Sequence, residues 1–484
     1  MVHLIYAIFV IFTITILKIG NCQLSIKQQQ HGQIHFSNDA PSSPAWKGKN
    51  PVTPSQVKPV YPESEMDKPR LEENLHNTNL PSIVDDSITF IQESDYDDVM
   101  QSFPIPNNHH QADNVSLAIT KFSLNLMKSI DQSQGGNVVV SPYSIATLLA
   151  LFVQGTTGDT RLQISRALRM SPEYSESSFK TIIEDIRMRN SPQNILCVAN
   201  NVYVSNTFNI NREFQSKAVN NFASEVTPMS FADPTKAVDD INYWVALKTR
   251  NMIKKLLSIQ NIDDETQLVL ANAIYFKGAW QKKFKKQSTS LQPFYLASGT
   301  TKMVSCMHSR HQFRAGIDRL NKAKVLVMPF AEREYSLMVL LPDKKSSVDT
   351  ILASLSSEQL TAYQTLEPID VVLTIPKFAI RADTDLKSVL KKMGITSMFS
   401  PNSELIGLGT SRGMAPQVST AVHSALLSID EEGAEAAAAT AFAAVALSYG
   451  GPDFEFKVDR PFVAVLWDTK LSLPLFLARI EDPS

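Results

Sequence analysis

The sequence predicts an α+β fold for residues 114–484 of the 484-residue chain. Apolar residues recur at helical spacing first, over 117–130 and 144–153. Continuous apolar runs of strand length dominate later, over 268–276, 325–330, 336–341 and 371–375. Because helices and strands do not alternate regularly along the chain, segregated elements fit better than a doubly wound parallel sheet.

Length and charge narrow the class of protein. A chain of 484 residues, 43% of them hydrophobic, can build one large domain or two ordinary ones. The formal net charge is -2, so the protein has no overall basic field that would hold nucleic acid or an anionic membrane. We therefore expect neither of these partners.

The first 22 residues have the pattern of a signal peptide. An apolar run covers residues 5–17, and Gly20-Asn21-Cys22 suits the positions before a signal-peptidase cut. The run is shorter than the roughly 20 residues of a membrane-spanning helix, and Lys18 ends it. This pattern favours secretion to the extracellular space over a membrane anchor.

The cysteines exclude a disulfide framework. Cys22 is expected to leave with the signal peptide, so the mature chain would keep only Cys197 and Cys306. One bridge between them stays open as an alternative, although two separate buried thiols are favoured because cysteine packs as a small hydrophobe. Two cysteines without clustered histidines make a poor zinc site, so we expect no metal.

Residues 23–113 differ in composition from the rest of the chain. They hold ten of the 26 prolines and no sustained apolar period, which is typical of a disordered extension. Within it, 84–103 is acidic and partly apolar, and it could either dock on a partner or serve as a solvated linker. Asn114 opens a glycosylation sequon where ordered structure is expected to begin.

One motif suggests a hydrolase and fails on its context. Residues 409–413 read GTSRG and match the G-x-S-x-G pattern of a nucleophile elbow. Pro416 interrupts the helix that should come next, and no acidic residue stands between Ser411 and His423. The segment is therefore interpreted as a glycine-rich surface turn, and no enzyme is expected.

The most informative stretch is 428–442, which reads SIDEEGAEAAAATAF. Its alanines alone would favour a helix. Several spaced motifs accompany it: NVVVSPYSI at 137–145, GTT at 155–157, INYWV at 241–245, LANAIYFKGAW at 270–280, FKVDRPF at 456–462 and PLFLAR at 474–479. In this order and spacing the chain resembles the serpin family over residues 114–484.

The resemblance implies a particular architecture and mechanism. The expected fold has a large central β-sheet, two further sheets, about nine helices and an exposed reactive-centre loop near 431–456. Serpins inhibit serine proteases as suicide substrates, because the cut loop inserts into the central sheet. Three residues depart from common family choices, namely Asn251, Ser424 and Ala478, and none of them lies in the hinge of the loop.

The hinge suits insertion as a strand. Gly433 supplies backbone freedom, and alternate residues that would face inward are small and uncharged. The inward set is Ala434, Ala436, Ala438 and Thr440, and the whole predicted hinge comprises Glu431, Glu432, Gly433, Ala434, Glu435, Ala436, Ala437, Ala438, Ala439 and Thr440. Such side chains could enter a packed sheet at little steric or desolvation cost.

Carrying the family pattern over places the reactive bond at Leu447-Ser448, with Ala446 and Tyr449 as alternatives. Since no Lys or Arg lies between Gly433 and Lys457, the expected target is a chymotrypsin-like or elastase-like serine protease.

Other residues have structural roles by resemblance. Ser141, Ser144, Asn272 and His423 would form a polar cluster beneath the opening of the sheet. Trp280 would cap the upper opening, and Lys377 would pair with Glu431. We expect a monomer that needs no cofactor. The alternative is a serpin-fold carrier without inhibitory activity. A glycosaminoglycan activator is a weaker hypothesis, since the basic run 282–286 fits a solvated turn.

Overall fold

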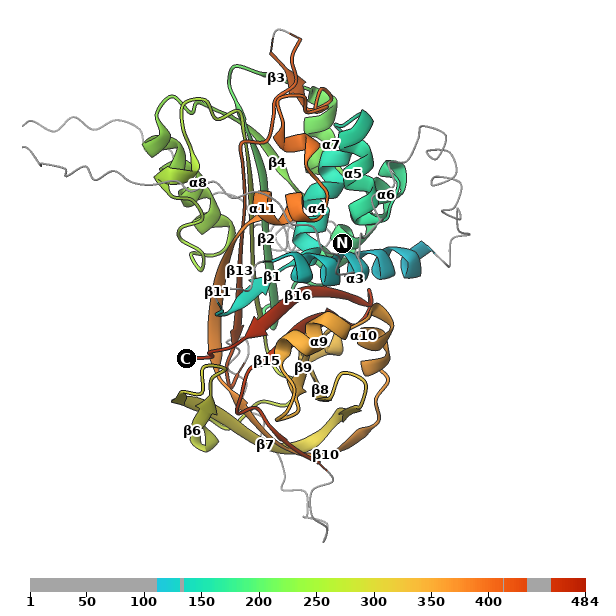
Figure 1. The fold of residues 1–484 in the computed structure, drawn as a ribbon, viewed down its shortest axis with the longest axis vertical. Helices are drawn as coiled ribbons and strands as arrows, with labels where there is room; N and C mark the ends of the chain where they lie inside the picture. The colour runs from blue at the N-terminus through green and yellow to red at the C-terminus, as the bar shows by residue number, and fades with distance from the viewer. Residues whose placement is uncertain (1–110, 131–134, 412, 433–453) are drawn as a thin grey trace, which may run out of the picture. The chain divides into compact units, whose positions relative to one another are not determined.

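The computed structural model describes residues 111–130, 135–411, 413–432 and 454–484. All of these residues belong to one unit, Ile88–Ser484 (Figure 1). The predicted signal peptide, nearly all of the extension with its acidic stretch 84–103, the hinge from Gly433 to Thr440 and the bond Leu447-Ser448 lie outside the described residues.

A five-stranded sheet forms one half of the fold, in the order β11-β13-β5-β2-β4. Its strands are β2 (Asn194–Ser205), β4 (Glu225–Met229), β5 (Leu268–Gly278), β11 (Phe378–Asp385) and β13 (Thr420–Ile429). In β5 every residue but Lys277 is buried, which explains its continuous apolar run. β13 and β5 run parallel, whereas β11 with β13 and β2 with β5 are antiparallel.

A nine-stranded sheet forms the other half, in the order β1-β16-β15-β9-β8-β7-β10-β14 with β6 paired to β7. Its strands are β1 (Val138–Val140), β6 (Ser290–Tyr295), β7 (Thr301–Asp318), β8 (Ala323–Pro329), β9 (Tyr335–Pro342), β10 (Pro368–Pro376), β14 (Phe454–Lys457), β15 (Phe462–Asp468) and β16 (Leu473–Ile480). A third sheet pairs β3 (Asn209–Ile210) with β12 (Gly409–Thr410).

Nine α-helices occur among the described residues: α3 (Gln111–Ser129), α4 (Pro142–Val153), α5 (Gly158–Leu168), α6 (Pro172–Arg189), α7 (Arg212–Phe222), α8 (Pro234–Lys248), α9 (Val348–Ser354), α10 (Ser357–Tyr363) and α11 (Leu386–Lys392). Helix α3 starts at Gln111, slightly before the predicted boundary at 114. The predicted glycosylation site Asn114 lies in its first turn.

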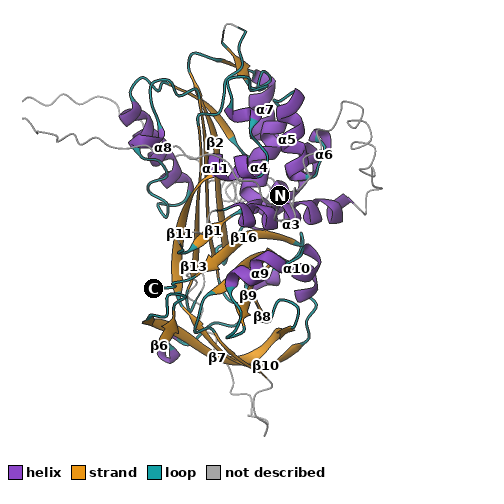
Figure 2. Cartoon of the chain, in the orientation of Figure 1, coloured by secondary structure: helices purple, strands orange, loops and turns teal. Residues whose placement is uncertain are grey.

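The five-stranded sheet lies between two helical layers (Figure 2). Helix α8 covers one face, and α4 lies against the other. Side chains of β5 point alternately to the two faces of the sheet. Val269 and Ala271 pack toward α8, while Leu270 and Ile274 belong to the larger core on the α4 side. Both faces of the central strands are therefore buried.

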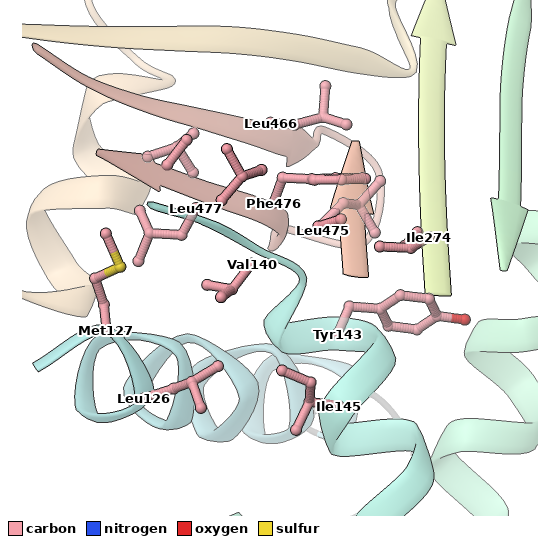
Figure 3. Close-up of a cluster of buried hydrophobic side chains, with 14 of the residues drawn as sticks. Leu126, Met127, Val140, Tyr143, Ile145, Ile274, Leu466, Leu475, Phe476 and Leu477 are labelled. Atoms are coloured by element: carbon pink, nitrogen blue, oxygen red, sulfur yellow. The ribbon is translucent and has the colours of Figure 1, made fainter. Parts of the chain in front are cut away.

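Helix α4 is the most completely buried of the described helices. All twelve of its residues are buried, Pro142 occupies its first turn, and the Ser141 hydroxyl caps it by accepting from the Ser144 backbone N–H. Its residues Tyr143 and Ile145 pack with side chains of α3, β5, β15 and β16 (Figure 3). Because α4 crosses under the central strands, its N-terminus can anchor polar groups of the sheet.

The sheets and helices confirm the predicted α+β architecture. The segment 409–413 is a turn only in part, because Gly409 and Thr410 lie in β12, whereas Ser411 and Met414 exchange backbone hydrogen bonds around a turn. No helix comes directly after Met414 among the described residues. Cys197 lies on β2 and Cys306 on β7, and no disulfide joins them.

Candidate functional site

The chain leaves β13 through a short segment, Asp430 to Glu432, that is held tightly to the body. Glu431 is 5% exposed as a whole residue. Its Oε2 accepts from Lys377 Nζ at 2.9 Å and its Oε1 accepts from Thr289 Oγ1 at 2.9 Å. Burial opposes ionisation of Glu431, but these hydrogen bonds outweigh burial and hold the pKa of the carboxyl below its usual range. The carboxylate is thus charged and fully engaged.

Trp280 closes the same end of the sheet. Its ring stacks on Phe330 with 4.3 Å between ring centroids, and its Nε1 donates to the Asp430 carbonyl at 2.7 Å. The backbone N–H of Phe284 donates to the Glu431 carbonyl at 3.0 Å. Side chains and backbone together therefore fix the three residues that precede Gly433.

The basic run 282–286 takes part in this arrangement. Its lysines are exposed, as expected of a solvated turn, but Phe284 is 6% exposed and packs edge-on against Trp280. Lys286 Nζ lies 2.6 Å from Glu432 Oε1. No sequence pattern predicted this pair, because its two members are far apart in the chain.

A buried polar cluster joins β13, β5, β2 and α4. His423 Nε2 accepts from the Ser141 backbone N–H at 3.0 Å, so Nδ1 carries the ring proton and donates to Asn272 Oδ1. Asn272 Nδ2 donates to Ser144 Oγ at 2.7 Å and to Asn200 Oδ1. The structure thus brings together all four residues that the resemblance grouped. It adds Asn200, which no sequence motif had marked.

Burial sets the charge state of this cluster. His423 is 0% exposed, and desolvation lowers its pKa to about 3. The imidazole is therefore neutral at physiological pH. That tautomer satisfies both of its neighbours at once, since one ring nitrogen accepts and the other donates.

Two residues of this cluster, His423 and Asn272, lie on the two strands that form the seam between β13 and β5. The two strands pair in parallel from Thr420 opposite Val269 to Leu427 opposite Phe276, and His423 faces Asn272 across the seam. A chain that reverses direction after Glu432 would run antiparallel to both strands. Separating them would require the hydrogen bond between His423 and Asn272 to break.

The structure also shows where the chain re-enters the fold after the loop. Described structure resumes at β14, which pairs in parallel with β10 in the nine-stranded sheet. The 21 residues 433–453 therefore connect the end of β13 to a different sheet. The predicted reactive bond lies within that connection.

Comparison with known proteins identifies the family. The family model described as "Serpin (serine protease inhibitor)" matches residues 117–483. The chain belongs to the serpin family. This confirms the resemblance stated from the motifs.

Serpin relatives match over most of their own length. Leukocyte elastase inhibitor from Sus scrofa is 33% identical over 379 residues, covering 76% of this chain and 99% of the relative. Leukocyte elastase inhibitor A from Mus musculus is 34% identical over 380 residues, with the same coverage. The crystal structure of Manduca sexta serpin-12 is 45% identical with a TM-score of 0.71, covering 76% of this chain and 98% of that structure.

Among the described residues, no group of three His, Cys, Asp or Glu side chains could hold a metal ion. Within the same ranges, no helix combines the length and the apolarity needed to cross a membrane.

Proposed function

We propose that this serpin inhibits a serine protease as a suicide substrate. The observation that carries the proposal is the parallel seam between β5 and β13, with Asp430 to Glu432 anchored directly after the C-terminal end of β13. A cut loop that folds back from this anchor can add a strand that is antiparallel to both neighbours. This function rests on the serpin family and on the small neutral residues of the hinge.

The covalent step is an ordinary acyl transfer. The protease serine Oγ attacks the Leu447 carbonyl carbon, the bond to the Ser448 nitrogen breaks, and the new amine takes the proton through the protease histidine. The inhibitor then remains attached to the protease as an ester of Leu447. Insertion of the loop moves the protease across the molecule before water can hydrolyse that ester.

The energy of insertion can be bounded from the register. Opening the seam sacrifices one ladder of eight paired positions, and a new strand makes two ladders in its place. At about 0.5–1.5 kcal/mol net for each hydrogen bond, a net gain of about eight bonds amounts to about 4–12 kcal/mol. Burial of the alanine side chains adds to this driving force.

The decisive experiment is adduct formation. The mature protein is incubated with elastase-like and chymotrypsin-like proteases, and SDS-stable adducts are sought on denaturing gels. The peptide separated by denaturation should begin at Ser448-Tyr449-Gly450. Cleavage of the loop with no adduct from any protease would contradict the proposal and would favour the non-inhibitory carrier.

A matched pair of variants tests the strand mechanism. Ala434→Arg puts a charge on the inward parity of the hinge, so it should be cleaved as a substrate without trapping the protease. Ala437→Arg puts the same side chain on the outward parity and should keep most of the trapping. Equal trapping by the two variants would rule out insertion as an alternating strand.

Three further properties belong to the proposal. The signal pattern supports secretion, and N-terminal sequencing of the exported protein should begin near residue 23. Asn114 would then carry a glycan, which mass spectrometry before and after glycosidase treatment can detect. The acidic stretch 84–103 would dock on a basic exosite of the protease and raise the association rate.

A further inference from the structure

The layer containing α8 spans the seam that insertion must open. After α8, residues 249–267 lead into β5, and this connection buries Ile253, Leu256 and Leu257 in the core between α8 and the sheet. That core includes Ala271 and Ala273 of β5, and Val422 and Leu426 of β13. The connection therefore contacts both sides of the seam.

A cluster of polar side chains ties this connection to the β13 side. Arg381 of β11 donates through Nη2 to the Lys255 carbonyl in the connection. The same guanidinium lies 2.8 Å from both carboxylate oxygens of Asp383. Its Nε lies 3.1 Å from Ser424 Oγ, which in turn donates to Asp383 Oδ1 at 2.6 Å.

The register shows why these residues meet. Asp383 stands opposite Ser424 in the β11–β13 ladder, and Arg381 stands opposite Leu426. Ser424 is fully buried between Val422 and Leu426, on the face that packs under α8. The Ser424 hydroxyl therefore links the Arg381 guanidinium to the Asp383 carboxylate at this point of the ladder.

We propose that Arg381 is a positioning residue that latches the α8–β5 connection to the β11–β13 half of the sheet, and so sets the rate at which a strand enters the seam. The inference rests on the proposed function. A new strand moves β13 away from β5 by about 4.7 Å, one interstrand spacing. The connection continues directly into β5, so its bond to Arg381 must break before the seam can open that far.

Another hydrogen bond joins the α8–β5 connection to β13 itself, but it lies at the other end of the seam. Thr420 Oγ1 donates to the Asn261 carbonyl at 2.7 Å, close to the start of both strands. The hinge begins at the opposite end of β13, so an inserting strand reaches Thr420 last. The inserting strand reaches Leu426, and therefore Arg381 opposite it, earlier than Thr420. We therefore expect the bond between Arg381 and the Lys255 carbonyl to limit the rate of strand insertion.

The test measures uptake of an isolated strand, with no protease present. A synthetic peptide with the sequence of residues 433–446 is incubated with the full mature protein, and complex formation is followed on native gels and by resistance to heat. Arg381→Met keeps an unbranched side chain as far as the ε position but removes the guanidinium donors. It should take up the peptide about tenfold faster than the parent, and Arg381→Lys, which retains a cationic donor group, should restore part of the delay.

Arg161→Met is the matched control. Arg161 Nη2 lies 3.0 Å from Glu173 Oε1, and neither residue belongs to a strand of the seam. The Arg161 side chain is 37% exposed, compared with 32% for the Arg381 side chain. Denaturant unfolding of every variant separates a general loss of stability from a specific change in uptake. If Arg381→Met takes up peptide at the parental rate, or if Arg161→Met accelerates uptake equally, the proposal that Arg381 slows strand insertion is wrong.

The same assay separates this failure from that of the proposed function. A parent that forms protease adducts and takes up peptide at the same rate as Arg381→Met would overturn the latch and leave inhibition standing. A parent that takes up no peptide and forms no adducts would overturn both.

Discussion

Acid should weaken the seam through one residue, His423. Its pKa is about 3 in the folded protein, compared with 6.5 for an ordinary histidine. The unfolded chain therefore binds a proton at a pH where the folded chain does not. The stabilisation is fully present above pH 6.5 and is lost as the pH falls from 6.5 towards 3.

The size of the effect can be worked out from this difference. Each pH unit between the two pKa values is worth about 1.36 kcal/mol, so lowering the pH from 7 to 5 should remove about 2 kcal/mol through His423. Protonation also turns Nε2 into a donor, which deprives the Ser141 N–H of its acceptor. Acid should therefore both destabilise the native state and ease separation of β13 from β5.

Denaturant unfolding at pH 7 and pH 5 measures this effect. We expect His423→Gln to lose about 2 kcal/mol less than the parent over that interval, because glutamine does not titrate. His308→Gln is the control, since His308 is only half-buried and its pKa, lowered by burial and by Lys457, should contribute less. If His423→Gln keeps the full pH dependence of the parent, then the buried neutral imidazole is not the source of acid sensitivity.

Three other outcomes are expected. Lys377→Met should lower the free energy of unfolding by about 1 kcal/mol in denaturant titrations, because it leaves the nearly buried Glu431 carboxylate without its cation, whereas Lys286→Met, at an exposed pair, should have no measurable effect. Leu447→Arg should shift adduct formation towards trypsin-like proteases in the same panel, and an unchanged preference would place the reactive bond elsewhere. Deleting residues 23–110 should slow protease association at low salt if the acidic stretch docks, and equal rates with and without these residues would make it a linker.

Local sequence was enough to predict the helices and strands whose apolar residues are buried in the core. The run at 268–276 became the fully buried part of β5, and the periods at 117–130 and 144–153 became α3 and α4. These predictions worked because apolar spacing reports burial directly. Strand order could not be obtained in this way, since β5 pairs with β13 some 150 residues later.

The candidate site was predicted unevenly for the same reason. Its four core polar residues came from resemblance to a family, and no spacing in the sequence brings His423 to Asn272. Contacts that are particular to this chain were missed altogether. Arg381 reaches a carbonyl 126 positions away, and Asn200 joins a cluster whose other members lie on three different elements. Such partners become visible only when the register of the sheet is known.

The first strand of the nine-stranded sheet has a consequence for biosynthesis. β1 leaves the ribosome early, yet the strand with which it pairs, β16, is synthesised only after every other strand of that sheet among the described residues. The nine-stranded sheet therefore cannot be completed until β16 has been made, and until then the pairing edge of β1 stays without a partner. A premature stop that removes β16 should leave a chain that aggregates or is degraded by quality control, even though its reactive-centre loop is intact.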